Sequence, residues 1–196
     1  MKNALSVLGT GIYLPPSSPV RDRVVEAGAD PSEYQGWDNS CHALKEDHPS
    51  TMGATALRKA LEDANVDPAE LKLVIFAGMS RDFLPSWSVA MDIMQTCGAK
   101  GTCLGMDMTV GCLGALNALD VAQGWLAVHG GGVAAIVAAE RWTYTVDFAS
   151  IENLGLWGHG DGAGAVIVSS DTDHPAKASF CGAEFVSQSD LNGTVL

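Results

Sequence analysis

One stretch, residues 104–128, constrains the fold of this chain more than any other. It contains a short apolar strand through Asp107, a turn flanked by glycines at Cys112, and a long run without proline. That run places apolar side chains around nearly the whole circumference of a helix, which is typical of a helix buried on all sides. The sequence therefore predicts a strand, a sharp turn and a buried helix at the centre of the fold.

Cys112 lies at the junction of strand and helix, between Gly111 and Gly114. In the first turn of a helix, unpaired backbone N–H groups and the positive end of the helix dipole favour a thiolate over a thiol. The thiolate is the nucleophilic form of cysteine. An inert core cysteine is the alternative. We favour a reactive Cys112, because its small neighbours leave a substrate room to approach.

The rest of the chain alternates between predicted strands and helices. Residues 9–16 are expected to be a turn-rich exit from the first strand, and residues 17–49 a partly helical excursion on the surface. Helices are expected from Ser50 or Thr51 to Ala64 and over residues 85–96, and strands over residues 5–8, 73–77, 133–139, 163–169 and 178–186. This order predicts an α/β layered fold, in which a mostly parallel sheet is covered by helices on both faces.

Composition excludes several classes of function. The 196 residues are 47% hydrophobic and include 23 acidic against 11 basic residues, which gives a formal net charge of -12. Such a charge argues against nucleic acid or an anionic membrane surface as the main partner. No apolar run approaches the length of a membrane span, so we expect a cytoplasmic protein. Five cysteines without closely spaced pairs indicate reduced thiols and no metal site.

Three further segments accompany the Cys112 run DMTVGCLGALNALDVA: the opening GTGIYLP, the segment STMGATALRKALEDANVDPAELKLVIFAGMS, and the glycine loop GHGDGAGAVIV. In this combination, residues 5–169 resemble the ketoacyl synthase III branch of the thiolase-like condensing enzymes. The resemblance implies a thiolase-like fold built from two related halves. Residues 1–170 would be the N-terminal half, which carries the nucleophile. Residues 171–196 would begin the C-terminal half, whose remainder, with a catalytic His and a polar partner, is absent from this chain.

The resemblance also implies roles for particular residues. Cys112 would be the catalytic residue. Tyr34 and Trp37 would stack on the coenzyme A end of the substrate, although the Arg-Thr-Gly-Ile stretch of the family is missing there. Phe83 would reach into the acyl pocket of a neighbouring subunit and help to set acyl length; a mobile surface loop is the alternative. His159 stands where the family usually has a bulky apolar residue. A structural or surface histidine is favoured there, and the alternative is that an imidazole near Cys112 acts as a base or tunes the substrate pocket.

Other residues have simpler interpretations. Asp107 is expected to be a buried structural carboxylate, and Glu140 is expected to pair locally with Arg141. Cys97, Cys103 and Cys181 are interpreted as packing residues. The glycine loop at 158–165 lacks the strand-loop-helix context of a nucleotide site and is interpreted as a tight turn.

These observations favour an acyltransferase. Cys112 would take an acyl group from acyl-CoA or an acyl carrier protein and pass it to a small-molecule acceptor. The second step would be O/N-acyl transfer or a decarboxylative condensation, in secondary metabolism. No cofactor is expected beyond the acyl-thioester substrate, and the resemblance implies a homodimer. Two alternatives remain: a non-catalytic partner subunit of a heterodimer of condensing enzymes, and a hydrolase with a cysteine nucleophile.

Overall fold

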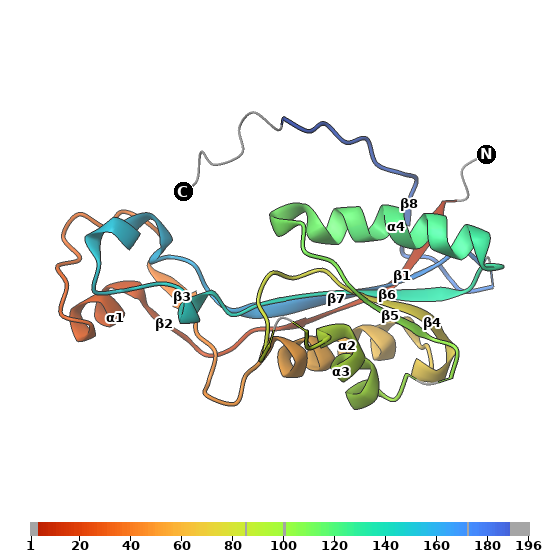
Figure 1. The fold of residues 1–196 in the computed structure, drawn as a ribbon, viewed down its shortest axis with the longest axis horizontal. Coiled ribbons are helices and arrows are strands. Elements are labelled where there is room, and N and C mark those ends of the chain that lie inside the picture. Colours follow the sequence, from red (N-terminus) through yellow and green to blue (C-terminus); the bar gives the residue numbers. More distant parts are fainter. Residues whose placement is uncertain (1–3, 85, 100, 172, 189–196) are drawn as a thin grey trace.

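The structure, a computed structural model, describes residues 4–84, 86–99, 101–171 and 173–188. These residues form three layers: a central sheet, helix α4 (Gly114–Val128) on one face, and helices α2 (Pro49–Ala64) and α3 (Val89–Cys97) on the other (Figure 1). The predicted α/β layered fold with helices on both faces is therefore confirmed. Among the described residues, no helix is long and apolar enough to span a membrane.

The sheet follows the order β5-β4-β6-β7-β1-β8. Strand β4 is parallel to both β5 and β6, and the other neighbouring pairs are antiparallel. It follows that β1, β4, β5 and β6 run in one direction, while β7 and β8 run in the other. The strands are β1 (Leu5–Tyr13), β4 (Leu71–Phe76), β5 (Leu104–Asp107), β6 (Val133–Glu140), β7 (Gly162–Ser169) and β8 (Ala178–Phe180).

Strand β1 continues to Tyr13, so the predicted turn-rich exit at residues 9–16 is wrong over most of its length. The glycines that indicated a turn instead allow α2 to pack closely on the strand. A Cβ atom on Gly9 would lie 2.7 Å from the carbonyl oxygen of Ala60, and one on Gly11 would lie 2.5 Å from the Ala60 nitrogen. Side chains at these two positions would push the helix off the sheet.

Helix α4 buries only one stripe of its surface. Gly114, Ala118, Ala122 and Leu126, spaced four residues apart, pack against the sheet. On its outer side, the side chain of Leu116 is 54% exposed. No other described element covers the outer side, so the expected burial of the helix on all sides stays a prediction.

The other helix boundaries shift by a few residues. Helix α2 starts at Pro49 after an N-cap at His48, not at Ser50 or Thr51; Thr51 instead accepts a hydrogen bond from the His48 N–H. Helix α3 starts at Val89 rather than at residue 85, which lies outside the described residues. The Ser88 side chain accepts a hydrogen bond from the Met91 N–H, so a serine N-cap fixes this start.

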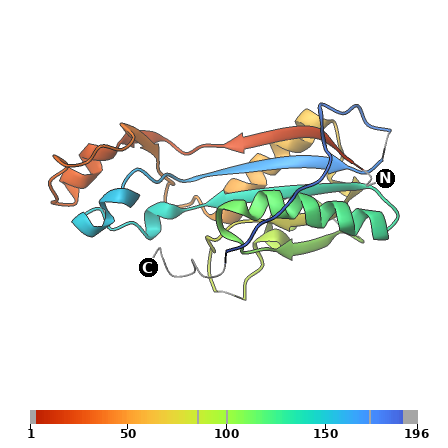
Figure 2. The same cartoon turned by 90° about the horizontal axis from the view of Figure 1, so that it is seen from above.

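Residues 14–48 and 141–160 together form an arm that extends beyond one end of the sheet (Figures 1 and 2). It contains β2 (Ser17–Pro19), α1 (Val20–Glu26), β3 (Asn39–Cys41) and short 3-10 helices at Trp142–Tyr144 and Ile151–Leu156. The expected surface excursion thus has a small core of its own, formed by Val20, Val24, Tyr34, Val146 and Trp157.

Arg141 attaches the arm to the sheet. Its guanidinium donates hydrogen bonds to the carbonyl oxygens of Leu44 and Asp47 and lies over the ring of Tyr144, 3.5 Å from the centroid. The expected pairing of Glu140 with Arg141 is wrong, because the Glu140 carboxylate accepts hydrogen bonds from the loop after β4.

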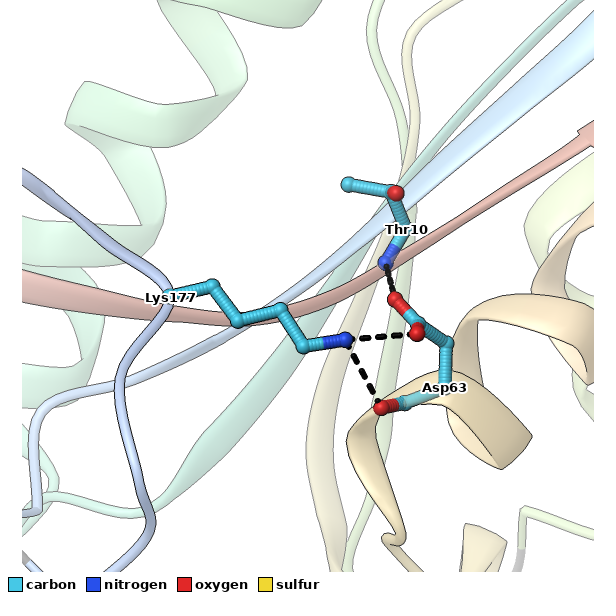
Figure 3. A network of polar contacts seen from close by, with 3 residues as sticks. All are labelled: Thr10, Asp63 and Lys177. Carbon is cyan, nitrogen blue, oxygen red and sulfur yellow. Dashed lines mark hydrogen bonds and ion pairs between the residues drawn. The ribbon is translucent and has the colours of Figure 1, made fainter.

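The connection from β7 to β8 is tied to α2 by Lys177. Its ammonium lies 2.5 Å from a carboxylate oxygen of Asp63 and donates to the Asp63 carbonyl, while the Thr10 N–H donates to the other carboxylate oxygen (Figure 3). The bond from Lys177 keeps the pKa of Asp63 below its usual value. Strand β8 then pairs with β1, and it is shorter than the expected strand at residues 178–186. The domain division at residue 170 stays a prediction.

Candidate active site

The parallel strands β4, β5 and β6 end at the same edge of the sheet, so the loops that follow them meet there. In open α/β sheets this carboxyl edge is where ligands bind. Cys112 lies at this edge, in a 3-10 turn (Gly111–Leu113) between β5 and α4. Its side chain is exposed. The sequence predicts Cys112 in the first turn of the helix. The structure places it just before α4.

Two glycines shape the turn around Cys112. Gly111 has φ +64°, a left-handed conformation that glycine adopts readily. Gly114 begins α4 where a Cβ atom would lie 3.0 Å from the carbonyl oxygen of Ala77. These two positions let the chain turn sharply and let α4 start against the end of β4. The first N–H groups of such a turn have no partner within it, so they are available to a ligand.

The loop after β4 runs beside the Cys112 turn. A Cβ atom on Gly111 would lie 3.8 Å from the Met79 sulfur. Arg81 donates from Nη2 to Thr109 Oγ1 over 2.5 Å, and from Nη1 to the carbonyl oxygens of Gly78 and Ser80. Arg81 is therefore a cationic residue of this edge, next to the residues that precede Cys112.

Glu140, at the end of β6, holds the same loop. Its carboxylate accepts hydrogen bonds from the backbone N–H groups of Met79 and Ser80 and from the Ser80 hydroxyl, over 2.7, 3.0 and 2.6 Å. The Ser80 hydroxyl oxygen in turn accepts from the Arg141 N–H. Three strand ends are thus joined by hydrogen bonds around the Cys112 turn.

Asp107, at the end of β5, accepts hydrogen bonds from the N–H groups of Val89 and Ala90, over 3.0 and 2.8 Å. Its carboxylate therefore satisfies the N-terminus of α3 and complements the helix dipole. This arrangement agrees with a structural carboxylate, although Asp107 is half-buried rather than fully buried.

The other cysteines differ from Cys112 in their surroundings. Burial raises the pKa of the Cys97 thiol, and it raises the pKa of Cys103 to about 11. Both are packing residues, as expected. Cys181 is exposed, so its interpretation as a packing residue is wrong.

Phe83 lies on the loop after β4 and is 62% exposed. Its ring centroid lies 5.3 Å from that of Trp87 and 5.6 Å from that of His48. Together with Leu84, Ser86 and Trp87, it lines an open hollow of about 320 Å³. An exposed aromatic cluster of this kind is typical of a contact surface.

The arm brings three other predicted site residues together. Tyr34, Trp37 and His159 line one cavity of about 420 Å³, which neither Cys112 nor Phe83 lines. Trp37 is 77% exposed, whereas Tyr34 is only 3% exposed and donates from its hydroxyl to the Trp37 carbonyl. Tyr34 thus supports Trp37 and does not offer a free ring face. The contacts found for His159 are within the arm, with Leu156 and Trp142.

The described residues contain no group of three or more His, Cys, Asp or Glu side chains arranged to hold a metal ion. Sequence reasoning did not identify the bond of Arg81 to Thr109 or the role of Glu140. The only signal for either was the position of each residue after an apolar strand.

Comparison with known proteins adds to this geometry. A family profile described as 3-oxoacyl-(acyl-carrier-protein) synthase III matches residues 106–189. A curated beta-ketoacyl-(acyl-carrier-protein) synthase III from Clostridium acetobutylicum is 31% identical over 173 residues, covering 85% of this chain and 51% of that protein.

Solved structures agree with the sequence comparison. A priming beta-ketosynthase from a polyketide biosynthetic pathway has a TM-score of 0.75 and 30% identity, covering 84% of this chain and 49% of that one. The 3-oxoacyl-(acyl-carrier-protein) synthase III of Aquifex aeolicus has a TM-score of 0.75 and 27% identity, covering 86% and 55%. The chain thus spans about half the length of these relatives.

Proposed function

We propose that this chain carries the nucleophile of an acyltransferase. The premise is that it is a ketoacyl synthase III-like protein with a thiolase-type fold over the part it spans. One observation supports the proposal most: Cys112 is exposed at the carboxyl edge of the sheet, in a glycine-flanked turn that leads into α4. A thiol in that position is accessible to an acyl thioester. The names of the related proteins, a beta-ketoacyl synthase III and a priming beta-ketosynthase, support the proposed acyl transfer.

In the first step, Cys112 Sγ attacks the carbonyl carbon of an acyl thioester. The bond from that carbon to the sulfur of the carrier breaks, and the carrier leaves as a thiol after taking up the proton that Cys112 loses. The negative charge that develops on the carbonyl oxygen needs hydrogen-bond donors. We propose backbone N–H groups of the Cys112 turn for this role, with a further N–H from the part of the protein beyond this chain.

In the second step, the acyl group passes from Cys112 to an acceptor. O/N-acyl transfer and decarboxylative condensation share the same first step. The absence of the Arg-Thr-Gly-Ile stretch supports a divergent member of the family, and we therefore propose a small-molecule acceptor and a role in secondary metabolism. The donor is acyl-CoA or an acyl carrier protein. A cytoplasmic location stays a prediction.

The arm supports a place for the carrier end of the donor. Trp37 lines the cavity with an exposed indole, which can stack on a planar group such as an adenine ring. His159 lines the same cavity, which favours a role in binding the carrier over a role as a base for Cys112.

The uncovered surfaces support two partners. The outer side of α4, with Leu113, Leu116 and Val128 exposed, requires a cover; we propose the remaining half of the protein. The edge strand β5 and the exposed Phe83, Trp87 and Met91, which lie before α3 or at its start, offer further apolar surface. We propose this surface as the homodimer interface, because an edge strand is a template for pairing with another chain.

The test is an intact-protein mass spectrum of the natural full-length gene product, before and after incubation with acetyl and malonyl thioesters. We expect an acyl-sized mass increase that is lost in Cys112→Ala. Cys181→Ala is the matched control, because Cys181 is the other exposed cysteine. An increase that persists in Cys112→Ala would contradict the proposal.

A non-catalytic partner subunit is the second candidate, favoured by the large uncovered apolar side of α4. It predicts that the full-length product copurifies with a homologous subunit and that no acyl thioester labels Cys112. A cysteine hydrolase would instead release free acid without any acceptor.

A further inference from the structure

Arg81 has hydrogen-bonding capacity left beside the proposed nucleophile. A guanidinium has five N–H donors, and Arg81 uses two on Nη1 for the carbonyl oxygens of Gly78 and Ser80 and one on Nη2 for Thr109. The Nε–H and the second N–H of Nη2 have no acceptor among the described residues. Two donors thus remain on a cation whose loop borders the Cys112 turn.

Arg81 also forms no ion pair within the described part of the chain. The one ion pair found there joins Lys177 to Asp63. The nearby carboxylates bind backbone N–H groups instead: Glu140 accepts from Met79 and Ser80, and Asp107 from the start of α3. The adjacent Asp82 accepts from the Ser50 N–H through one oxygen, and its other oxygen is buried without a partner among the described residues. Arg81 is half-buried, where an unpaired charge costs more than it does in water.

The Arg81 side chain is held rather than mobile. Besides its three hydrogen bonds, its guanidinium lies 5.4 Å from the centroid of the Phe76 ring. Glu140 and Ser80 fix the backbone on one side of it. A guanidinium fixed in this way loses little side-chain entropy when it binds an anion.

We propose that Arg81 is a specificity-determining residue that selects acyl groups ending in a free carboxylate. The inference rests on the function proposed for Cys112. The thioester carbonyl of such a donor binds at the Cys112 turn, and its distal carboxylate accepts hydrogen bonds from Arg81. The exchange itself is unchanged: the acyl-to-carrier C–S bond breaks, the acyl-to-Cys112 C–S bond forms, and the carrier leaves as a thiol.

The position of Arg81 favours a carboxylate over a phosphate of the carrier. Arg81 bonds to Thr109, three residues before the nucleophile, whereas the cavity proposed for the carrier end lies in the arm. A short acyl chain attached to Cys112 ends near the turn. Arginine recognises a carboxylate through paired N–H donors, with a charge-assisted hydrogen bond that a neutral acyl group cannot make.

The experiment compares charged and uncharged acyl groups of similar size on the full-length gene product. Malonyl-CoA and succinyl-CoA are each tested against butyryl-CoA, and the rate of Cys112 acylation is measured by intact mass. Succinyl is included because it does not lose its carboxylate as malonyl can. We expect faster loading of the two charged groups, and a charged-to-uncharged ratio that falls about tenfold or more in Arg81→Met.

Two further variants separate selection from structure. Arg81→Lys keeps the charge and should keep part of the preference, and Arg58→Met removes an exposed arginine of α2 and should leave the ratio unchanged. A wild-type protein that loads butyryl as fast as succinyl would overturn the proposal about Arg81, while Cys112-dependent loading would still uphold the proposed function. An equal loss of both acyl groups in Arg81→Met and Arg81→Lys would also overturn it. The absence of any Cys112-dependent loading would end both proposals.

Discussion

A Cβ atom on Gly114 would lie 3.0 Å from the carbonyl oxygen of Ala77. This close approach sets the start of α4 against the end of β4, and with it the position of the Cys112 turn. Only a residue without a side chain fits there without a shift of helix or strand.

Gly114→Val should therefore displace the Cys112 turn. We expect at least a tenfold loss of acyl loading, and a free energy of unfolding lower by about 1–3 kcal/mol from overpacking. Loading is measured by intact mass and stability by urea unfolding of the full-length product. Gly124→Ala is the control, because Gly124 lies in the same helix with nothing within 4 Å of its Cβ position. Gly124→Ala should be neutral or stabilising by about 0.5–1 kcal/mol; equal effects of the two changes would contradict this view.

A similar close approach occurs at Gly11 of β1, on the other face of the sheet. A Cβ atom on Gly11 would lie 2.5 Å from the Ala60 nitrogen. Gly11→Val should lower the urea midpoint strongly, because backbone on both sides cannot move away cheaply. Gly164→Val in β7 is the matched control, since nothing lies within 4 Å of that position. A Gly11→Val protein as stable as Gly164→Val would show that α2 does not pack as described.

These glycines also show where the sequence was insufficient. The strands at β4, β6 and β7 could be predicted because each contains a continuous apolar run. Gly9 and Gly11 suggested a turn. Their actual role, the close approach of α2, depends on residues about fifty positions away and leaves no local sign in the sequence. The apolar outer side of α4 suggested complete burial, but its cover is not among the described elements.

The candidate site divides in the same way. Cys112 could be predicted because a local signal, glycines at a strand-to-helix junction, marks it. The approach of Arg81 to Thr109 depends on β4 and β5 being neighbours, which no local pattern encodes. The cavity shared by Trp37 and His159 depends on two distant segments that meet in the arm.

Thiol reactivity should follow exposure and pKa. Cys112 and Cys181 are exposed, whereas burial raises the pKa of Cys97 and Cys103. Iodoacetamide at pH 8 should therefore alkylate Cys112 and Cys181 first in the native protein, because the thiolate is the reactive form. Peptide mapping by mass spectrometry measures the order, and alkylation in urea is the control for accessibility. Early modification of Cys103 would contradict the described packing.

His42 predicts a pH dependence of stability. It is buried in the arm, with Nε2 2.7 Å from Ser40 Oγ and with Nδ1 lacking a partner among the described residues. Burial, aided by the positive charge of Arg23, lowers its pKa from 6.5 to about 4, although Asp161 opposes the shift. The folded protein therefore keeps His42 neutral where the unfolded chain binds a proton.

The contribution of the neutral His42 to the free energy of unfolding is fully present above pH 6.5. It is lost as the pH falls from 6.5 towards 4, because the unfolded chain then binds a proton that the folded protein does not. The loss reaches about 3 kcal/mol, at 1.36 kcal/mol for each pKa unit. Urea midpoints at pH 7, 6 and 5 measure this loss, with His42→Phe as the comparison, since phenylalanine is similar in shape to histidine and does not titrate. We expect the variant to lose less stability than the wild type between pH 7 and pH 5, whatever its stability at pH 7. Parallel curves for the two proteins would show that the buried imidazole is not the group responsible.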